Sequence, residues 1–370
     1  MKFCVVLSTR PEIIKLSPFI NVLKNKKDNF YLINTNQHSL KNMSKVFFNF
    51  FNIKTKIYNL WPSKKSQFIF LSESIRMIST ILKKKKPDYL VVQGDTNTSL
   101  AGCLAASLLN RNLSSKEKIK IVHIESGLRS FDDTMPEEIN RKIIDELSNI
   151  LFVPTQFDLK NLVNENCIKN KDVYVVGNTI SDVLKEYLPK CSKSTILKQL
   201  KIKQDNFFLV TVHRPESVDN KKNLLKLSNI FNHILKKYNF PIIFPIHPRT
   251  RSKLKKFGIK FNKKIKIIDP LEYLDFLKLV KSSKILLTDS GGLQEESSII
   301  GVPCITLRDT TERQITMIKK VNRLAGYKKS KVISSINYFM KKKISKIKDF
   351  GTGKVSVKIY NKLLQIDKKN

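Results

Sequence analysis

The feature that most constrains the fold of this chain is a repeated alternation between short apolar runs and longer amphipathic segments. The runs in the first half are Phe3–Leu7, Tyr31–Thr35, Tyr89–Gln93, Ile119–Ile124, Ile150–Val153 and Val173–Val176. Continuous, β-branched runs of this length are typical of strands that are covered on both faces. The amphipathic segments between them are predicted helices, namely Pro11–Lys24, Ser66–Leu82, Thr98–Leu109 and Pro136–Leu147. Repeated strand–helix units predict a parallel sheet with right-handed crossovers.

The same alternation restarts after Gly177. The predicted strands of the second half are Phe207–Val212, Ile242–Ile246, Ile265–Ile268, Ile285–Thr288 and Cys304–Leu307. The predicted helices are Leu224–Leu235, Tyr273–Val280 and Gly292–Ile300. A chain of 370 residues is long enough for two domains with full cores. We therefore predict an α/β protein with two Rossmann-like, doubly wound domains, 1–178 and 179–350, and a ligand site in the cleft between them.

Composition excludes some classes of protein and leaves one alternative open. No apolar run reaches the roughly 20 residues that a spanning helix needs, and the opening FCVVL is too short for a signal peptide. Five cysteines without a C-x-x-C pair favour a reducing compartment, so we predict a cytoplasmic protein without a transmembrane segment. The net charge of +38 would suit a nucleic-acid-binding protein, but the lysines are spread along the chain rather than gathered in one stripe.

Charged residues follow the predicted strands of the first half. Arg10 follows the first strand at a strand-to-helix turn, where it can meet a phosphate, and Lys15 lies about one helical turn later. Asp95 follows the third run, either as a helix N-cap or as a functional carboxylate. Glu125 follows a buried strand, and Glu137 lies in a first helical turn. Because parallel strands end at one edge of a sheet, these carboxylates are expected to converge there.

The second half repeats this arrangement. His213 follows one predicted strand and His247 follows the next. Ser290 and Gly291 open a predicted helix whose free backbone N–H groups can bind an anion, and Glu296 lies on that helix. The sequence contains no H-E-x-x-H, no paired C-x-x-C and no G-x-S-x-G, so it predicts neither a metal site nor a serine-hydrolase triad.

The ordered motifs STRPE, QGDT, HIESGLRS, MPEEINR, HRPES, HPR, DSGGLQEE and LRDTTER resemble those of the non-hydrolysing UDP-N-acetylglucosamine 2-epimerase family. The resemblance runs from Arg10 to Gly326 and implies a glycosyltransferase-B-like fold, with a C-terminal tail, 351–370, that returns to the first domain. It implies an isomerase that interconverts UDP-GlcNAc and UDP-ManNAc for surface polysaccharide precursors. It also implies a UDP-sugar substrate and a homodimer, and neither an added cofactor nor a metal.

The resemblance also assigns roles to individual residues. The positions that match the family's acid–base groups are Asp95, Glu125, Glu137 and His213. The positions that match its UDP-sugar contacts are Arg10, Lys15, Arg141, His247, Phe276, Ser290, Gly291, Glu296 and Arg313. Among these, Glu296 matches the ribose-binding carboxylate and Phe276 the aromatic residue beside uracil. Gln37-His38 matches a segment implicated in regulation by substrate.

The chain departs from the family pattern at a few loop positions. Ser8 and Asn36 stand where glycines are usual, Gln314 replaces a proline, and Lys319-Lys320 replaces a Gly-Thr pair. The motifs HRPES and MPEEINR also occur in relatives that act at C2 of other UDP-2-acetamido sugars. Two alternatives therefore remain beside UDP-GlcNAc epimerisation: another UDP-2-acetamido sugar as substrate, or a UDP-sugar-dependent glycosyltransferase.

The implied chemistry explains why acid–base groups and an anion site are needed together. The C2 hydrogen of the sugar has no adjacent carbonyl group, so the family eliminates UDP to form 2-acetamidoglucal. UDP then adds back while C2 is protonated on the opposite face. This reaction needs acid–base groups around C2 and donors that hold the departing diphosphate.

Overall fold

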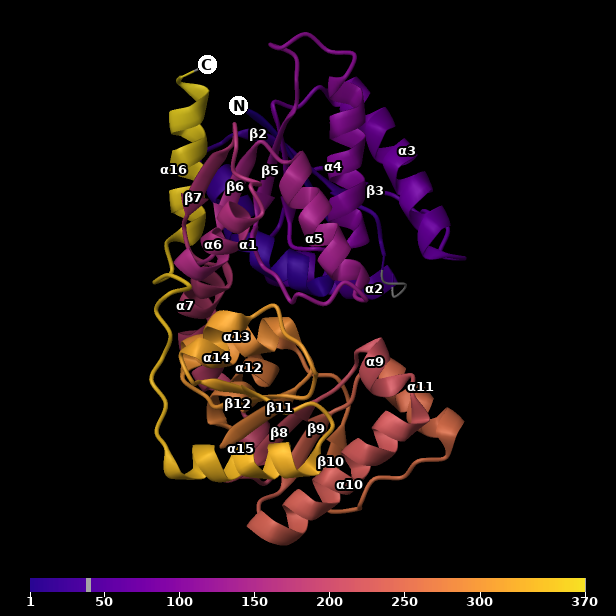
Figure 1. The fold of residues 1–370 in the computed structure, drawn as a ribbon, viewed down its shortest axis with the longest axis vertical. Coiled ribbons are helices and arrows are strands. Elements are labelled where there is room, and N and C mark those ends of the chain that lie inside the picture. The colour runs from indigo at the N-terminus through magenta and orange to yellow at the C-terminus, as the bar shows by residue number, and fades with distance from the viewer. Residues whose placement is uncertain (38–40, 370) are drawn as a thin grey trace. The chain divides into compact units, whose positions relative to one another are not determined.

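The computed structural model describes residues 1–37 and 41–369, with only the backbone described for residues 41–45. Contacts divide the chain into two compact units. Unit 1 comprises residues 1–183 and 349–370, and unit 2 comprises residues 184–348. Each unit is built on one parallel sheet with helices on both faces (Figure 1). The predicted α/β class with two doubly wound domains is confirmed.

The sheet of unit 1 has seven parallel strands in the order β3-β2-β1-β4-β5-β6-β7. The strands are β1 (Lys2–Leu7), β2 (Asn29–Asn34), β3 (Ile57–Asn59), β4 (Tyr89–Gln93), β5 (Lys120–Ile124), β6 (Ile150–Val153) and β7 (Asp172–Val175). Strands β1, β4, β5 and β6 lie inside the sheet and are almost entirely buried, as their continuous apolar sequences predict. The switch in strand order between β1 and β4 places the ends of these two strands side by side.

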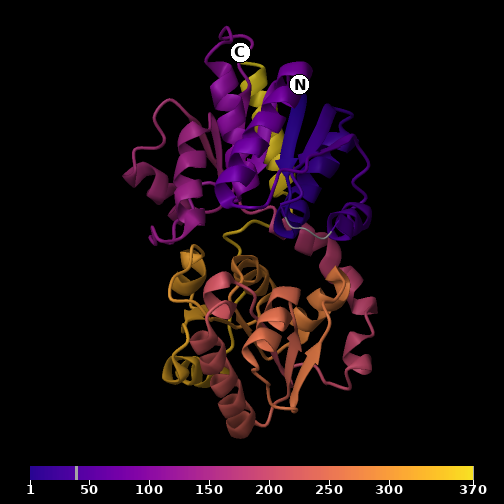
Figure 2. The ribbon, with the colours of Figure 1, turned by 90° about the vertical axis from the view of Figure 1, so that its right-hand side faces the viewer.

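Helices cover both faces of this sheet (Figures 1 and 2). They are α1 (Arg10–Asn25), α2 (Lys41–Phe50), α3 (Gln67–Lys85), α4 (Asn97–Asn110), α5 (Pro136–Leu147), α6 (Gln156–Asn164) and α16 (Val355–Asp367). Helix α7 (Ile180–Lys190) begins in unit 1 and continues into unit 2. Helices α3 and α5 both pack against α4, and α16 packs against α1. The core between the sheet and α3–α5 is apolar, with Cys4 and Val6 of β1 meeting Ile78 and Leu82 of α3.

The sheet of unit 2 has six parallel strands in the order β10-β9-β8-β11-β12-β13. The strands are β8 (Phe208–Thr211), β9 (Ile242–Pro245), β10 (Ile265–Ile268), β11 (Ile285–Thr288), β12 (Cys304–Thr306) and β13 (Asn322–Leu324). The helical segments are η1 (Cys191–Lys193), α8 (Ile196–Gln199), α9 (Pro215–Val218), α10 (Lys221–Tyr238), α11 (Pro248–Phe257), α12 (Tyr273–Ser282), α13 (Gly291–Ile300), α14 (Gln314–Ile318) and α15 (Lys329–Lys341). The central strands β8 and β11 carry the polar turns described below.

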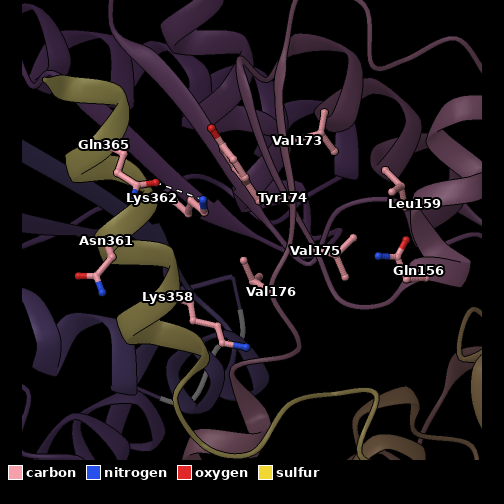
Figure 3. Close-up of a pocket in the computed structure, with 10 residues that line it drawn as sticks. All are labelled: Gln156, Leu159, Val173, Tyr174, Val175, Val176, Lys358, Asn361, Lys362 and Gln365. Atoms are coloured by element: carbon pink, nitrogen blue, oxygen red, sulfur yellow. Dashed lines mark hydrogen bonds between the residues drawn. The ribbon is translucent and has the colours of Figure 1, made fainter. Parts of the chain in front are cut away.

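A hollow of about 490 Å³ lies in unit 1 between the edge strand β7 and helix α16 (Figure 3). The aromatic ring of Tyr174 lines it from β7, and the ammonium group of Lys362 lies 4.9 Å from that ring. Lys362 also donates a hydrogen bond of 3.1 Å to Gln365 on the next turn of α16. The hollow marks where the C-terminal segment covers the edge of the unit 1 sheet.

Candidate active site

The turn between β1 and α1 is organised by the buried carboxylate of Glu12. One carboxylate oxygen accepts hydrogen bonds from the backbone N–H groups of Ser8 (3.0 Å) and Thr9 (2.6 Å). The other accepts from the hydroxyl groups of Thr96 (2.6 Å) and Ser99 (3.2 Å), which open helix α4. Burial raises the pKa of Glu12, and these donors counteract part of that effect. Glu12 therefore joins the loops that follow β1 and β4.

Glu125 and Lys15, two predicted site residues, form a buried ion pair. The ammonium nitrogen of Lys15 lies 2.6 Å from a carboxylate oxygen of Glu125, and both side chains are almost fully buried. The same oxygen accepts a hydrogen bond of 2.5 Å from the side-chain amide of Gln93 at the end of β4. Glu125 also has a left-handed backbone conformation, with φ at +72°, which is uncommon for a residue other than glycine. The ion pair, the amide hydrogen bond and the backbone conformation together fix the orientation of the Glu125 carboxylate at the end of β5.

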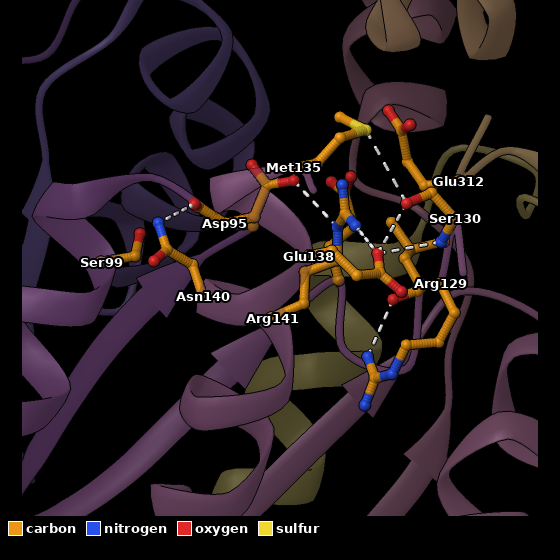
Figure 4. Close-up of polar contacts among 12 residues, drawn as sticks. Asp95, Ser99, Arg129, Ser130, Met135, Glu138, Asn140, Arg141 and Glu312 are labelled. Carbon is orange, nitrogen blue, oxygen red and sulfur yellow. Dashed lines mark hydrogen bonds and ion pairs between the residues drawn. The ribbon is translucent and has the colours of Figure 1, made fainter. Parts of the chain in front are cut away.

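Asp95 pairs with Arg141 at the neighbouring strand end. The side chain of Asp95 accepts a hydrogen bond of 3.0 Å from Nε of Arg141 on α5, and its backbone oxygen accepts one of 2.9 Å from Asn140 (Figure 4). About 28% of the Asp95 side chain is exposed, so its carboxylate remains accessible to a ligand. The alternative that Asp95 is a helix N-cap is wrong, because Thr96 caps α4 by accepting from the backbone N–H of Ser99.

Glu137 and Glu138 both lie in the first turn of α5, but they differ in burial and in hydrogen bonding. Glu137, the predicted acid–base residue, is partly exposed on the first turn. Glu138 is buried and accepts hydrogen bonds from the backbone N–H groups of Ser130 (2.9 Å) and Phe131 (3.0 Å) (Figure 4). Glu138 also pairs with Arg141. The structural role in this motif therefore belongs to Glu138, while the side chain of Glu137 remains available to a ligand.

In unit 2, the turn after β8 is held by the buried carboxylate of Asp289, which follows β11. One oxygen of Asp289 accepts from the backbone N–H groups of His213 and Arg214, both at 2.8 Å. The other oxygen lies 3.3 Å from Nδ1 of His213. Burial raises the pKa of Asp289, but His213 and the two backbone donors outweigh burial and lower it to about 2. The sequence analysis quoted this aspartate within DSGGLQEE but gave it no role.

His247 lies beside His213, with ring centroids 5.3 Å apart. His247 is the N-cap of α11, and its Nδ1 accepts a hydrogen bond of 3.2 Å from the backbone N–H of Arg249. The opposite ring nitrogen, Nε2, therefore carries the hydrogen of the neutral ring. The two histidines from different strand ends are brought together, as the sequence analysis expected of residues at one sheet edge.

Ser290 is the N-cap residue of α13, and Gly291 is the first residue of that helix. The carboxylate of Glu312 lies so close to Gly291 that a Cβ atom there would collide with it, which explains the need for glycine. Glu296 is buried on the same helix. Phe276 lies half-buried on α12, the helix that packs against α13.

Arg313 is held by two carboxylates. Its Nε atom lies 2.5 Å from Glu295, and its Nη1 atom lies 3.3 Å from Glu312. Glu312 is also paired with Arg308 at 3.0 Å. The sequence analysis assigned a role only to Arg313, although the neighbouring glutamates fix its guanidinium group. The feature of the sequence that could have indicated these glutamates is the concentration of charged residues in the motifs DSGGLQEE and LRDTTER, which each follow an apolar strand.

Arg10 occupies the first turn of α1, and its guanidinium group lies 4.8 Å from the ring centroid of Phe47. Gln37 donates from its backbone N–H to the hydroxyl oxygen of Ser8 at 2.6 Å and accepts from Thr98 at 3.0 Å. His38, the other residue of the predicted regulatory segment, lies outside the described residues.

The departures from the family pattern are accommodated by local backbone geometry. Asn36 has φ at +49°, and asparagine tolerates this left-handed region better than most residues. Gln314 is the first residue of α14, a position where proline is favoured but not required. Lys319, which stands at the glycine position of the Gly-Thr pair, has φ at −76°, a value that residues other than glycine adopt freely.

All five cysteines are free and buried, and burial raises the pKa of both Cys4 and Cys304 to about 12, which disfavours a reactive thiolate. Across residues 1–37 and 41–369, no three His, Cys, Asp or Glu side chains gather as a metal site would require. Within the same residues, no helix combines the length and the apolar character that crossing a membrane demands.

The fold places this chain in the glycosyltransferase-B-like class. The profile of the UDP-N-acetylglucosamine 2-epimerase family matches residues 21–364, and the chain belongs to that family. The UDP-N-acetylglucosamine 2-epimerase of Methanocaldococcus jannaschii is 44% identical over 97% of this chain and 98% of its own length. Its crystal structure in complex with UDP-GlcNAc and UDP matches with a TM-score of 0.91 over 99% of this chain and 100% of that chain.

A second relative has a different substrate in its name. The UDP-2,3-diacetamido-2,3-dideoxy-D-glucuronate 2-epimerase of Pseudomonas aeruginosa is 33% identical over 99% of this chain and 100% of its own length. Relatives of this chain are therefore named for more than one UDP-sugar substrate. The family resemblance seen in the sequence is confirmed.

Proposed function

We propose that this protein is an isomerase that interconverts UDP-GlcNAc and UDP-ManNAc. The observation that carries the proposal is the whole-chain likeness to the M. jannaschii epimerase, whose structure holds UDP-GlcNAc and UDP. Charged side chains at the strand ends support the proposal, because Lys15 pairs with Glu125, Arg141 pairs with Asp95, and His213 lies beside Asp289.

The proposed reaction breaks the C2–H bond and the bond between C1 and the diphosphate oxygen, which gives 2-acetamidoglucal and UDP. The C1–O bond then re-forms while a proton is delivered to the opposite face of C2. We assign the proton transfers to Asp95, Glu125 and Glu137 of unit 1 and to His213 of unit 2. The pairing of Glu125 with Lys15 at 2.6 Å favours an ionised carboxylate, as a base requires.

The departing diphosphate needs donors that stabilise its charge. We assign this role to Arg10, His247, Arg313 and the N-terminal backbone of α13 at Ser290 and Gly291. The free N–H groups of a helix N-terminus favour an anion, and the guanidinium group of Arg313 is held in one orientation by Glu295 and Glu312. The remaining proposed UDP-sugar contacts are the charged groups of Lys15 and Arg141, the carboxylate of Glu296, which would bind the ribose hydroxyls, and the ring of Phe276, which would lie beside uracil.

The deciding experiment is NMR spectroscopy of UDP-GlcNAc incubated with the purified protein in D2O, without any acceptor. The expected product is UDP-ManNAc that carries deuterium at C2, because the proton added back comes from solvent. Epimerised product without deuterium at C2 would contradict elimination and re-addition. A glycosyltransferase would leave C2 unlabelled and would form no epimer.

A different UDP-2-acetamido sugar is the second candidate substrate, and the P. aeruginosa relative is the observation that favours it. The two candidates are separated by offering UDP-GlcNAc and a UDP-2,3-diacetamido uronate in parallel. Turnover of the second sugar alone would replace UDP-GlcNAc as the substrate while retaining the reaction.

We also propose that the active form is a homodimer. Large apolar side chains are exposed near the first turns of α3 and on α5, the two helices that pack against α4, namely Trp61 (52%), Phe68 (78%), Ile139 (49%) and Ile143 (37%). Exposed apolar side chains of this size are typical of protein interfaces. Light scattering should give twice the mass of 42.8 kDa, and Phe68→Asp should reduce it to the monomer. A monomeric wild-type protein would contradict the proposal.

The cytoplasm is the proposed compartment, because five free, buried thiols persist where disulfides are kept reduced. Cell fractionation checks this location, and recovery of the protein in a secreted fraction would contradict it.

A further inference from the structure

Four titratable side chains form a cluster beneath the strand ends of unit 1, and three of them are fully buried. They are His123 on β5, Asp145 on α5, Arg129 in the loop between these elements, and Glu165 after α6, of which only Glu165 is partly exposed. Asp145 accepts from Nδ1 of His123 and from Nη1 of Arg129, both at 2.7 Å, and Arg129 is paired with Glu165 at 2.6 Å. None of these residues has a role in the proposed proton transfers or UDP contacts.

The partners of His123 determine how many hydrogens its ring carries. Nδ1 faces the Asp145 carboxylate, and Nε2 lies 3.0 Å from the backbone carbonyl oxygen of Gly94. A carbonyl oxygen only accepts, and so does an ionised carboxylate. Nη1 of Arg129 and the backbone N–H of Gly127 donate to the other oxygen of Asp145, at 2.7 Å and 3.2 Å, so Asp145 is ionised. His123 can therefore satisfy both acceptors only when both ring nitrogens bear hydrogen.

Charge balance leads to the same conclusion. Arg129 carries one positive charge, and Asp145 and Glu165 carry two negative charges between them. A cationic His123 makes the cluster neutral, whereas a neutral ring would leave one excess negative charge next to side chains that are fully buried. Buried charges without compensation are costly.

The contact with Gly94 links this cluster to the proposed chemistry. Gly94 has φ at +68° and immediately precedes Asp95. The His123 ring lies two residues before Glu125 on the same strand end, and Asp145 lies one turn beyond Arg141, the partner of Asp95. The contact of Nε2 with the Gly94 carbonyl oxygen therefore helps to hold the backbone from which the Asp95 carboxylate extends, together with the hydrogen bonds from the Gly94 N–H to Ile124 and from Asn140 to the backbone oxygen of Asp95.

We propose that His123 is a positioning residue for the epimerisation: its doubly protonated ring, fixed by Asp145, donates to the Gly94 carbonyl oxygen and holds the Asp95 carboxylate in its working position. The proposal rests on the proposed function for its kinetic consequence. The protonation state and the hydrogen bond do not depend on which UDP-sugar is the substrate.

The kinetic test uses two variants that each keep one of the two donors. In His123→Gln the side-chain NH2 group extends to about the position of Nε2 and can still donate to Gly94. In His123→Asn it lies about where Nδ1 lies and can still donate to Asp145. His233→Asn on α10 of unit 2 is the matched control, since it removes a histidine outside this cluster.

We expect His123→Asn to lower kcat by about 10²-fold with KM near the wild-type value, because misplacement of a catalytic group by about 1 Å has an effect of this size. His123→Gln should retain much more of the wild-type kcat, even if its melting temperature falls further than that of His123→Asn. Equal losses in both variants, or a larger loss of kcat in His123→Gln, would show that Gly94 is not the relevant partner and would overturn the proposal.

A second measurement does not require turnover. The protein has five histidines, so a ¹⁵N-histidine spectrum of the wild-type chain resolves few ring signals. Both ring nitrogens of His123, assigned by the signals lost in its variants or by through-bond correlation, should bear hydrogen at the assay pH. A ring nitrogen without hydrogen would overturn the proposal even if the enzyme is active. An inactive wild type with a doubly protonated His123 would instead contradict the proposed function.

Discussion

At the scale of a single residue, Glu125 has both a restricted backbone conformation and a fixed side chain, and it is one of the proposed acid–base groups. Its backbone is left-handed, its side chain is buried, and its carboxylate is fixed by Lys15 and Gln93. A non-glycine residue in this conformation costs on the order of 1–3 kcal/mol, which the surrounding structure must offset. Such a cost at the end of β5 is consistent with selection for the direction of the carboxylate rather than for stability.

The first prediction concerns the proposed acid–base carboxylates. Asp95→Asn and Glu125→Gln keep the side-chain shapes but remove the negative charge, so each should lower kcat by about 10²-fold or more. Steady-state kinetics with UDP-GlcNAc measures this loss. Asp133→Asn is the control, because Asp133 has a 77% exposed side chain near α5 and should retain full activity. Near-normal turnover in both test variants would refute the assignment.

The second prediction concerns acid stability and Asp289. Its pKa is lowered from 3.8 to about 2 in the folded protein, so the folded state binds the proton less readily than the unfolded state. The resulting stabilisation is fully present above pH 3.8 and is lost as the pH falls toward about 2. It amounts to about 2 kcal/mol. Asp289→Asn should therefore lower the stability of unit 2 near neutral pH and flatten its decline between these pH values.

Denaturant unfolding at a series of pH values measures this effect, and Asp269→Asn provides a control because the Asp269 side chain is 87% exposed. An acid decline in Asp289→Asn as steep as in the wild type would mean that other carboxylates cause it.

The strand-end positions of Asp95 and Glu125 could be predicted from the sequence, whereas the side chains that hold distant loops could not. Asp95 and Glu125 were found because a carboxylate directly after an apolar strand is conspicuous. Glu138, Asp289 and His123 were missed as individual contributors, because their role is to accept or donate hydrogen bonds to segments distant in sequence. Such partners are fixed only when the chain has folded.

At the scale of elements, apolar periodicity predicted the central strands because these are buried on both faces. It missed β3 and β13, which have three residues each and lie at sheet edges. A strand that is this short and covered on one side contains too few apolar residues to form a recognisable pattern. The helix N-terminus at Ser290 was found through its glycine pair, whereas the short α9 and α14 were not predicted.

The third prediction concerns the joint between β7 and α7. Gly177 has φ at +103°, and a Cβ atom there would lie 2.7 Å from the backbone oxygen of Phe350. Gly177→Ala should destabilise unit 1 by more than the roughly 1–2 kcal/mol that a left-handed alanine costs, since the Phe350 backbone must also move. Gly258→Ala is the matched control, because Gly258 has φ at +65° with open space around it. Equal losses in urea unfolding would show that the contact with Phe350 is unimportant.

At the scale of the whole molecule, unit 1 is assembled from two separated stretches of chain. Residues 349–370 belong to unit 1 although all of unit 2 lies before them in the sequence. The apolar side chains that this stretch buries are Phe350, Val355, Ile359, Tyr360, Leu363 and Ile366. The family resemblance implied a returning tail, but periodicity alone could not show where it docks. The apolar face of an amphipathic helix indicates that the helix packs against something, but not against which element.

The fourth prediction tests this arrangement. A chain that stops after Lys348 loses six buried apolar side chains, each worth roughly 1.5–3 kcal/mol, a total comparable with the whole stability of a domain. Unit 1 should lose cooperative thermal unfolding and bind a hydrophobic dye. A chain that stops after Asp367 should behave like the full chain, because Lys368 and Lys369 are exposed. Cooperative unfolding of unit 1 in the shorter chain would contradict the prediction.

The divided unit 1 also sets an order of events on the ribosome. Synthesis proceeds at about 5–20 residues per second, so roughly 20–70 s separate the emergence of β1 from that of α16. Until α16 emerges, the surface of α1 that it will cover is open to the cell, and every residue of unit 2 has emerged before α16 does. The nascent first unit must therefore be shielded by chaperones or stay partly unfolded, and the unit translated second is the one that can be completed first.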